Sequence, residues 1–212
     1  MKKIGIIGSG EVGKTLAMGF IKHSYNVMIG TEHLEKLEGW KNQNKVQAGG
    51  FSDTAKFGDI LVLAVKGIIA KKVLEKIGRE VLGNKIVIDT TNPIAESPPE
   101  NGVIKFFTSL DKSLMEEFQE EFQNVRFVKA FNSIGNAFMV NPEFEEKPTM
   151  FFCGNDSDAK SKVNEILQKF GFEPQDMGKA TSARAIEPLC ILWCIPGFLD
   201  NEWNHAFRLI KK

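Results

Sequence analysis

The sequence contains few of the residues that build disulfide frameworks or metal sites. Its 212 residues include only three cysteines and three histidines. Cys190 and Cys194 lie four residues apart inside an apolar run, so we expect two core thiols on one face of a helix. No nearby His or Cys completes a ligand set around them, which argues against a metal site. Thiols without a disulfide framework are typical of proteins in a reducing compartment.

Neither sign of charge is in excess, and no apolar run is long. Lys plus Arg and Asp plus Glu both number 27, so the formal net charge is zero. This balance gives no general reason to expect a nucleic acid or an anionic membrane as partner. The longest apolar stretch, Leu189–Leu199, contains Pro196 and Gly197, and we expect it to be too short to span a bilayer. Because no signal-peptide pattern is visible, we expect a soluble cytoplasmic protein.

The first thirteen residues carry the most specific motif. Lys3–Ile7 predicts a short buried strand, and Gly8-Ser9-Gly10-Glu11-Val12-Gly13 follows it, directly before a helical pattern. In this G-x-G-x-x-G arrangement Gly8 allows a sharp turn, Gly10 lets the backbone approach a pyrophosphate, and Gly13 lets the helix pack closely on the strand. The first turn of the helix presents N–H groups to the phosphates. The motif predicts dinucleotide binding; the alternative is a glycine turn in an α/β protein that binds nothing.

Segments typical of strands alternate with segments typical of helices along most of the chain. Unbroken apolar runs such as Ile60–Val65 are typical of parallel strands covered on both faces. The predicted strands are Lys3–Ile7, Asn26–Gly30, Ile60–Val65, Ile86–Asp89, Arg126–Phe131, Thr149–Cys153 and an edge strand, Phe172–Asp176. The predicted helices are Glu11–His23, 36–45, a short one capped by Ser52 and Asp53, one through Val73–Val81, Ser113–Phe122, one capped by Ser157 and ended by Gly171, and Ser182–Trp193.

This alternation predicts an α/β fold with a Rossmann-type, doubly wound and mostly parallel sheet. Residues 1–178 form the expected dinucleotide-binding domain, and residues 179–212 form a small helical appendage. In such a sheet, ligands bind outside the carboxyl ends of the strands. The turns at those ends supply the candidate site residues: Ser9–Val12, then Thr31, Glu32 and His33, then Val65, Lys66 and Gly67, then Thr91, Asn92 and Pro93, then Asn132, Ser133 and Ile134.

The end of the second strand discriminates between NAD and NADP. An acidic residue there normally bonds the ribose hydroxyls of NAD, whereas a hydroxyl followed by Arg normally holds the extra phosphate of NADP. Here Thr31 is followed by Glu32, whose carboxylate would repel that phosphate. Lys36 or His33 could offset part of the repulsion. Alternatively, Glu32 points to solvent.

Several stretches together resemble one family. They are Gly5–Gly10, Ile88–Pro93, Val128–Asn132, Cys153–Asp156, Asp176–Gly178 and Ala183–Leu189, in order along nearly the whole chain. With them the chain resembles the NADP-dependent reductases of the deazaflavin coenzyme F420 and their bacterial relatives. It is also similar to the cytoplasmic domain of membrane ferric reductases, although the membrane part has no counterpart in the sequence.

The resemblance implies a role for most of the candidate residues. Ser9, Gly10, Glu11 and Val12 would take the pyrophosphate, Thr31 and Lys36 would lie near the adenosine ribose and its phosphate, Asn92 and Pro93 would lie near the nicotinamide, and Asn132 and Ser133 would border a second ligand, a deazaflavin or a flavin. The chain departs from the family at Glu32, where Arg is usual. NAD and NADP therefore both stay open as the cofactor.

The expected chemistry requires no catalytic side chain. In a hydride transfer between a nicotinamide and a flavin-like ring the cofactors carry the reaction, and the protein aligns them and excludes water. Lys66, just past a central strand, is a solvated loop lysine or a donor to a ligand carbonyl or phosphate. Arg184 and Glu187 share a helix face at a spacing of three, which predicts an internal ion pair. The alternative is an Arg that reaches an anionic ligand.

The last thirty residues are unusually apolar. Trp193, Phe198, Trp203 and Phe207 exceed what a short terminal helix needs for its own packing. We expect this segment to line the pocket of the second ligand and to form a homodimer contact. Two functional classes follow: an oxidoreductase that passes hydride to a small acceptor, and a dinucleotide-binding redox sensor without turnover. A hydroxyacid or imine reductase would require a substrate-side acid that the sequence does not place.

Overall fold

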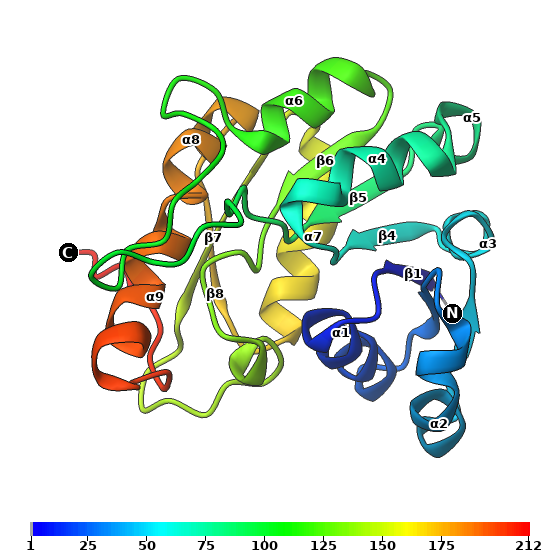
Figure 1. The fold of residues 1–212 in the computed structure, drawn as a ribbon, viewed down its shortest axis with the longest axis horizontal. Helices are drawn as coiled ribbons and strands as arrows, with labels where there is room; N and C mark the ends of the chain where they lie inside the picture. The colour runs from blue at the N-terminus through cyan, green and yellow to red at the C-terminus, as the bar shows by residue number, and fades with distance from the viewer. Residues whose placement is uncertain (1) are drawn as a thin grey trace.

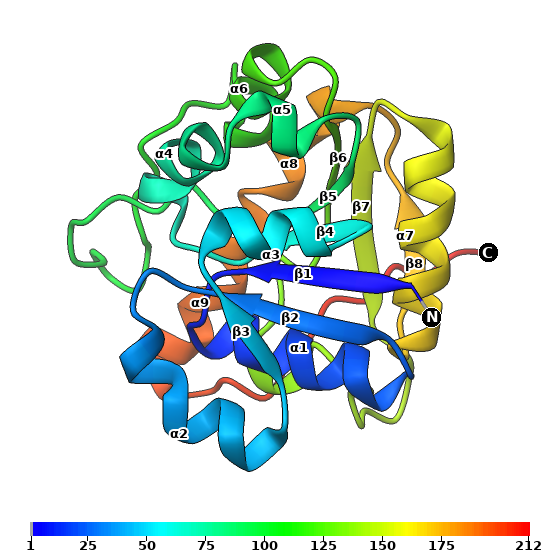
Figure 2. The same cartoon turned by 90° about the vertical axis from the view of Figure 1, so that its right-hand side faces the viewer.

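A computed structural model describes residues 2–212 and shows one eight-stranded sheet with helices on both faces (Figures 1 and 2). The strands lie in the order β3-β2-β1-β4-β5-β6-β7-β8. All neighbours are parallel except β6 and β7, which are antiparallel. The strands are β1 (Lys3–Ile7), β2 (Asn26–Gly30), β3 (Gln47–Gly49), β4 (Ile60–Leu63), β5 (Ile86–Asp89), β6 (Arg126–Lys129), β7 (Thr149–Gly154) and β8 (Glu173–Asp176).

The predicted doubly wound α/β fold is confirmed, with one strand missed. The unpredicted β3 has only three residues, which is too short to show a strand period. Two predicted strands end early, β4 at Leu63 and β6 at Lys129, because the chain turns there into the loops that form the carboxyl edge of the sheet. β8 lies at the edge, as its Pro174 predicted.

The helices follow the predicted order, but several of their starts differ from the prediction: the second helix begins at Leu34 and not at residue 36, and the helix predicted through Val73 begins at Gly67. They are α1 (Glu11–Lys22), α2 (Leu34–Asn44), α3 (Phe51–Phe57), α4 (Gly67–Ile77), α5 (Arg79–Leu82), α6 (Leu114–Glu121), α7 (Ser157–Lys169), α8 (Ala183–Ile186) and α9 (Leu189–Asp200), with 3-10 turns at Asn136–Phe138 and Ala180–Ser182. Gly50, not Ser52 or Asp53, precedes α3. Asp156, not Ser157, caps α7, because its carboxylate accepts the N–H of Ala159 at 2.7 Å.

The core forms two apolar layers, one on each face of the sheet. Ile4 and Ile6 of β1 face one layer, together with Leu16 and Phe20 of α1. Ile7, Leu61 and Leu63 face the other, together with α4 and α6. Because neighbouring residues of one strand contribute to opposite layers, a central strand such as β4 is apolar and buried throughout, as its unbroken run in the sequence indicated.

The carboxyl-terminal segment is more continuous than the sequence suggested. Residues Ala180–Asp200 form one helical stretch of 21 residues, because α9 continues through Pro196. By length and composition alone this stretch could cross a bilayer, and 33% of its most apolar window is buried in the fold. The apolar run Leu189–Leu199, which we expected to be too short to span a bilayer, forms only the second half of it. After α9 the chain runs back to the sheet, where the carbonyl of Phe207 accepts the N–H of Thr149 at 2.8 Å.

Candidate functional site

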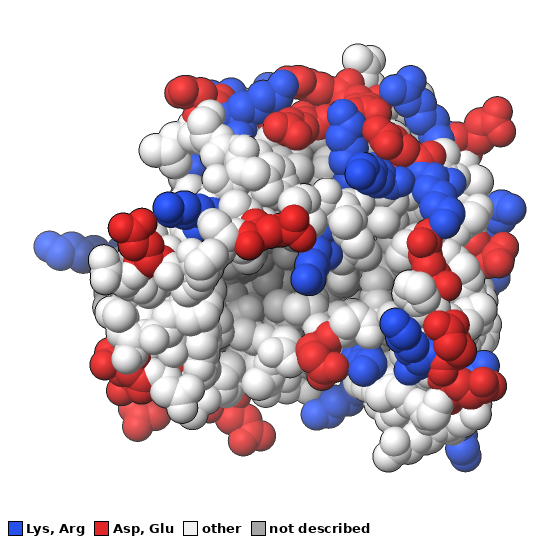
Figure 3. Space-filling model, in the orientation of Figure 1, with Lys and Arg blue, Asp and Glu red and all other residues white. Residues whose placement is uncertain are grey.

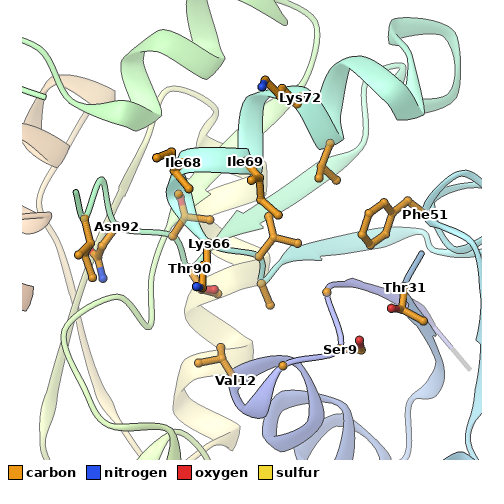
Figure 4. Close-up of a pocket in the computed structure, with 18 of the residues that line it drawn as sticks. Ser9, Val12, Thr31, Phe51, Lys66, Ile68, Ile69, Lys72, Thr90 and Asn92 are labelled. Carbon is orange, nitrogen blue, oxygen red and sulfur yellow. The ribbon is translucent and has the colours of Figure 1, made fainter. Parts of the chain in front are cut away.

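A cavity of about 910 Å³ runs along the carboxyl edge of the sheet. Figure 3 shows the hollow near the middle of one face of the molecule, with charged side chains at its rim. The turns after β1, β2, β4 and β5 line it, and α4 covers it from above (Figure 4). Its lining residues include Ser9, Gly10, Glu11, Val12, Thr31, Glu32, His33, Phe51, Val65, Lys66, Ile68, Ile69, Lys72, Lys76, Thr90, Thr91, Asn92, Ile94 and Glu96.

The turn from β1 into α1 is shaped by Gly8 and Gly13. Gly8 has φ +124°, a backbone conformation that residues with a side chain rarely adopt. Its N–H donates a hydrogen bond to the carbonyl of Gly30 at 3.0 Å. A Cβ on Gly13 would lie 2.1 Å from the carbonyl oxygen of Gly8. Both glycines therefore fix the backbone of the turn, although Gly13 itself does not line the cavity.

Gly10 differs from these two glycines. A Cβ at Gly10 would meet no atom within 4 Å, although the residue lines the cavity. Gly10 is also the residue before α1, and no side chain caps the first N–H groups of that helix. The fold therefore leaves an empty space in front of an uncapped helix amino terminus, which is an arrangement that fits a phosphate group.

One end of the cavity, which we call the Thr31 end, is polar. Thr31 is buried, and its Oγ1 accepts the N–H of His33 at 3.1 Å, so its hydroxyl proton can be donated to a ligand. Glu32 forms an ion pair with Lys76 of α4. Phe51 completes this end, beside Thr31 in Figure 4.

The opposite end, the Asn92 end, is held by paired amides. Asn92 Nδ2 donates to the carbonyl of Asn132 at 2.7 Å, and Asn132 Nδ2 donates to Asn92 Oδ1 at 3.1 Å and to the carbonyl of Ile186 at 2.9 Å. Asn132, Ser133 and Ile134 are buried and do not line the cavity. In this structure Asn132 thus supports Asn92 and joins it to α8.

Beneath the Asn92 end lies a fully buried ionic cluster. Lys129 Nζ lies 2.7 Å from Asp89 Oδ2 and 2.9 Å from Glu187 Oε1, and it donates to the carbonyl of Thr91 at 2.8 Å. Burial opposes the charge on Lys129, but the two carboxylates outweigh it, so the pKa of Lys129 is raised. Glu187 also accepts the N–H groups of Leu114 and Met115 at the start of α6.

This arrangement overturns the ion pair expected between Arg184 and Glu187. Arg184 instead pairs with Glu116 of α6 through three hydrogen bonds of 2.7–3.1 Å. Burial opposes the charge on Glu116, and hydrogen bonds from Arg184 and Ser113 reverse that effect, so its pKa is lowered. Arg184 lies on α8 and Glu187 directly follows it, but helical spacing could not show that α6 supplies partners to both of them.

The remaining residues singled out in the sequence differ in whether they line the cavity. Lys66 is exposed, precedes α4 and lines the cavity, whereas Lys36 and Pro93 do not line it. His23 ends α1, as expected, and its ring stacks on Phe170. Cys190 is buried, but Cys194 is only half-buried. Within residues 2–212 no group of three or more His, Cys, Asp or Glu side chains could hold a metal ion.

The residues that sequence reasoning missed come mainly from α4 and from the loop after β5. They are Phe51, Ala64, Ile68, Ile69, Lys72, Val73, Lys76, Thr90, Ile94, Ala95 and Glu96. The rule that ligands bind at the carboxyl ends of the strands selects only the first residues after each strand. It therefore cannot find residues that lie one to three turns into the following helix. A lysine spacing of four in α4, at Lys72 and Lys76, was the one available signal, because such residues share a helix face.

The comparisons with known proteins agree with this geometry. Residues 3–93 match the model of the family described as NADP oxidoreductase, coenzyme F420-dependent. The F420-dependent NADP reductase of Methanocaldococcus jannaschii is 26% identical over 200 residues, which cover 88% of each protein. A solved structure of a candidate F420-dependent NADP reductase from Arthrobacter sp. FB24 superposes over 100% of both chains, with a TM-score of 0.92 and 27% identity. The chain is similar in sequence and in fold to the coenzyme F420-dependent NADP oxidoreductases.

Metalloreductases form a second group of relatives. Rat metalloreductase STEAP3 is 26% identical over 202 residues, which cover 93% of this chain and 39% of STEAP3. The chain therefore spans about two fifths of the length of that metalloreductase. The matched family model ends at Pro93, so it contains β1 to β5 but none of the carboxyl-terminal helices.

Proposed function

We propose that the chain is an NADP(H)-dependent oxidoreductase that passes hydride between the nicotinamide and a small acceptor. The observation that carries the proposal is the empty space in front of Gly10, at the uncapped start of α1. Ser9, Gly10, Glu11 and Val12 would hold the pyrophosphate there. The adenosine would lie toward Thr31, and the nicotinamide toward Asn92, because the cavity extends from this turn in both directions (Figure 4).

The nicotinamide supplies the hydride chemistry when it is bound, and the chain supplies orientation and shielding. Asn92 offers an amide that is itself fixed by Asn132. Thr90 is held by its hydroxyl, which donates to the carbonyl of Leu63 at 2.9 Å. Rigid side chains of this kind restrict the ligand to few orientations, which is the contribution a protein makes to a transfer between two cofactors.

The acceptor that fits best is planar and partly apolar, such as a deazaflavin or a flavin. Ile68, Ile69 and Ile94 line the cavity and keep 40–44% of their surface exposed. Exposed isoleucines at a cavity rim favour an apolar ligand face over a charged one. A separate cavity of about 360 Å³, lined by Ile134, Trp193 and Trp203, supports the predicted contribution of the carboxyl-terminal segment to a second-ligand pocket.

Oxidation of NADPH and NADH with a panel of acceptors tests this function. The panel contains a deazaflavin, free flavins, quinones and ferric chelates, and the decay of nicotinamide absorbance is followed for each. We expect faster oxidation with a deazaflavin or flavin than with the other classes. Tight binding of the dinucleotide without reduction of any acceptor would instead favour a redox sensor without turnover, and absence of dinucleotide binding would exclude both.

A further inference from the structure

The Thr31 end contains a cation that comes from the opposite wall. Lys76 lies near the end of α4, 44 residues from Glu32 in sequence, and forms an ion pair with it across the cavity. Lys72 lies one helical turn earlier and lines the same cavity. Lys76 of α4 thus reaches the strand end at which the adenosine ribose would lie, whereas Lys36 of α2 does not line the cavity.

The pair between Glu32 and Lys76 can exchange partners readily. Its side chains keep 44% and 66% of their surface exposed, and exposed ion pairs of this kind contribute little to stability. A phosphate dianion offers more charge and more acceptor oxygens than a carboxylate, so it would compete well for the same ammonium group. A ribose with a free hydroxyl would leave the pair intact, with Glu32 able to accept from that hydroxyl.

We propose that Lys76 determines the specificity for the 2′-phosphate of NADP and supplies the cation that an Arg after Thr31 would otherwise provide. Lys76 stays with Glu32 when the ribose carries a free 2′-hydroxyl, and it moves to the phosphate when one is present. The site therefore accepts both dinucleotides, with the preference for NADP carried by α4 instead of by the end of β2. This inference rests on the dinucleotide site proposed above.

The test separates the phosphate from the rest of the cofactor. Calorimetric titration of the full chain with 2′,5′-ADP and with 5′-ADP measures the two affinities without any hydride transfer. In Lys76→Met we expect the affinity for 2′,5′-ADP to fall roughly ten- to a hundred-fold, the usual range for a lost charge-assisted hydrogen bond, and the affinity for 5′-ADP to change less than about twofold.

Lys71→Met provides a matched control. Lys71 also lies on α4 and also pairs with a glutamate, Glu121 at 2.6 Å, but it does not line the cavity. We expect this variant to leave both affinities unchanged, and Lys76→Arg to keep the preference for 2′,5′-ADP. Circular dichroism shows that the variants are folded before titration.

Two results would overturn the inference in distinguishable ways. If the unaltered chain binds both nucleotides and Lys76→Met leaves their ratio of affinities unchanged, Lys76 has no part in specificity and the dinucleotide site stands. If the unaltered chain binds neither nucleotide, the dinucleotide site itself is wrong, and the role of Lys76 fails with it.

Discussion

The three glycines of the turn after β1 have different roles: two shape the backbone, and one leaves space for a ligand. Gly8 and Gly13 cannot carry a side chain without disturbing the backbone, whereas Gly10 can. The motif in the sequence already predicts a different role for each of the three glycines. Only the surroundings of each Cβ position show that the empty one is Gly10.

Replacing Gly10 by Val tests this difference. The valine side chain would stand in the space proposed for the pyrophosphate, so we expect a folded protein whose affinity for NADPH falls at least about tenfold, or ~1.4 kcal/mol. Gly39→Ala in α2 is the control, because Gly39 also has open space but lies outside the cavity. Fluorescence titration with NADPH measures the affinities. If the valine variant binds NADPH as tightly as the parent, the pyrophosphate does not bind in front of Gly10.

Glu32→Arg tests the residue that departs from the resemblance. The change replaces a carboxylate by a guanidinium at the Thr31 end, where each charge pair at 4 Å is worth about 1 kcal/mol in a water-like surrounding. We expect the ratio of NADPH to NADH affinity to rise roughly fivefold or more. Separate calorimetric titrations with the two cofactors give the ratio. An unchanged ratio would place Glu32 outside the ribose site.

At the scale of elements, two ionic contacts attach α8 and the residue after it, Glu187, to the sheet and to α6. Glu187 reaches Lys129 on β6 and the start of α6, and Arg184 reaches Glu116 on α6. Lys129 also holds the carbonyl of Thr91, so the same cluster fixes the turn at the Asn92 end. The position of this turn therefore depends on elements from three distant parts of the chain.

Lys129→Met should destabilise the fold strongly. It leaves the buried carboxylates of Asp89 and Glu187 without their cation, and loss of one partner from a buried pair typically costs about 3–5 kcal/mol. Urea unfolding followed by circular dichroism measures the loss. In Lys129→Met with Asp89→Asn we expect part of the stability to return. A single variant as stable as the parent would show that the cluster contributes nothing to stability.

The contact between Arg184 and Glu116 should appear in the pH dependence of stability. Because the pKa of Glu116 is lowered from 4.5 in the folded chain, its charge contributes stability above that value, and the contribution is lost as the pH falls through the lowered pKa. In Arg184→Met we expect acid unfolding to begin at a higher pH than in the parent. Lys112→Met serves as the control, because Lys112 pairs with Glu120 at the surface. Coincident acid transitions in parent and Arg184→Met would contradict the assignment.

At the scale of the whole molecule, the carboxyl-terminal helix leaves apolar side chains uncovered. Leu192, Phe198 and Leu199 of α9 keep 46–58% of their surface exposed. Figure 1 shows α9 at the side of the molecule, away from the helices that cover the sheet. An apolar face of this kind is typical of an interaction surface, which keeps the predicted homodimer as our proposal.

Sedimentation velocity tests the homodimer. We expect the parent chain to sediment as a dimer and Leu192→Glu with Leu199→Glu to sediment as a monomer, since a buried charge without a partner opposes association. Substituting only side chains is preferable to deleting the segment, because deletion would also remove Glu187 from the buried cluster. A parent chain that sediments as a monomer would exclude the dimer, and binding to vesicles would indicate a membrane surface for the same face.

What the sequence determined by itself is local and repetitive. Apolar runs fixed the central strands, helical spacing fixed α1, α6 and α7, and the glycine motif located the turn after β1, because each depends only on neighbouring residues. Tertiary structure alone decided the partners of residues far apart in sequence. Glu32 pairs with Lys76, Arg184 pairs with Glu116 and not with the predicted Glu187, and Asn132 is hydrogen-bonded to Asn92. Such pairings depend on how the helices pack over the sheet, and no spacing along the chain records that distance.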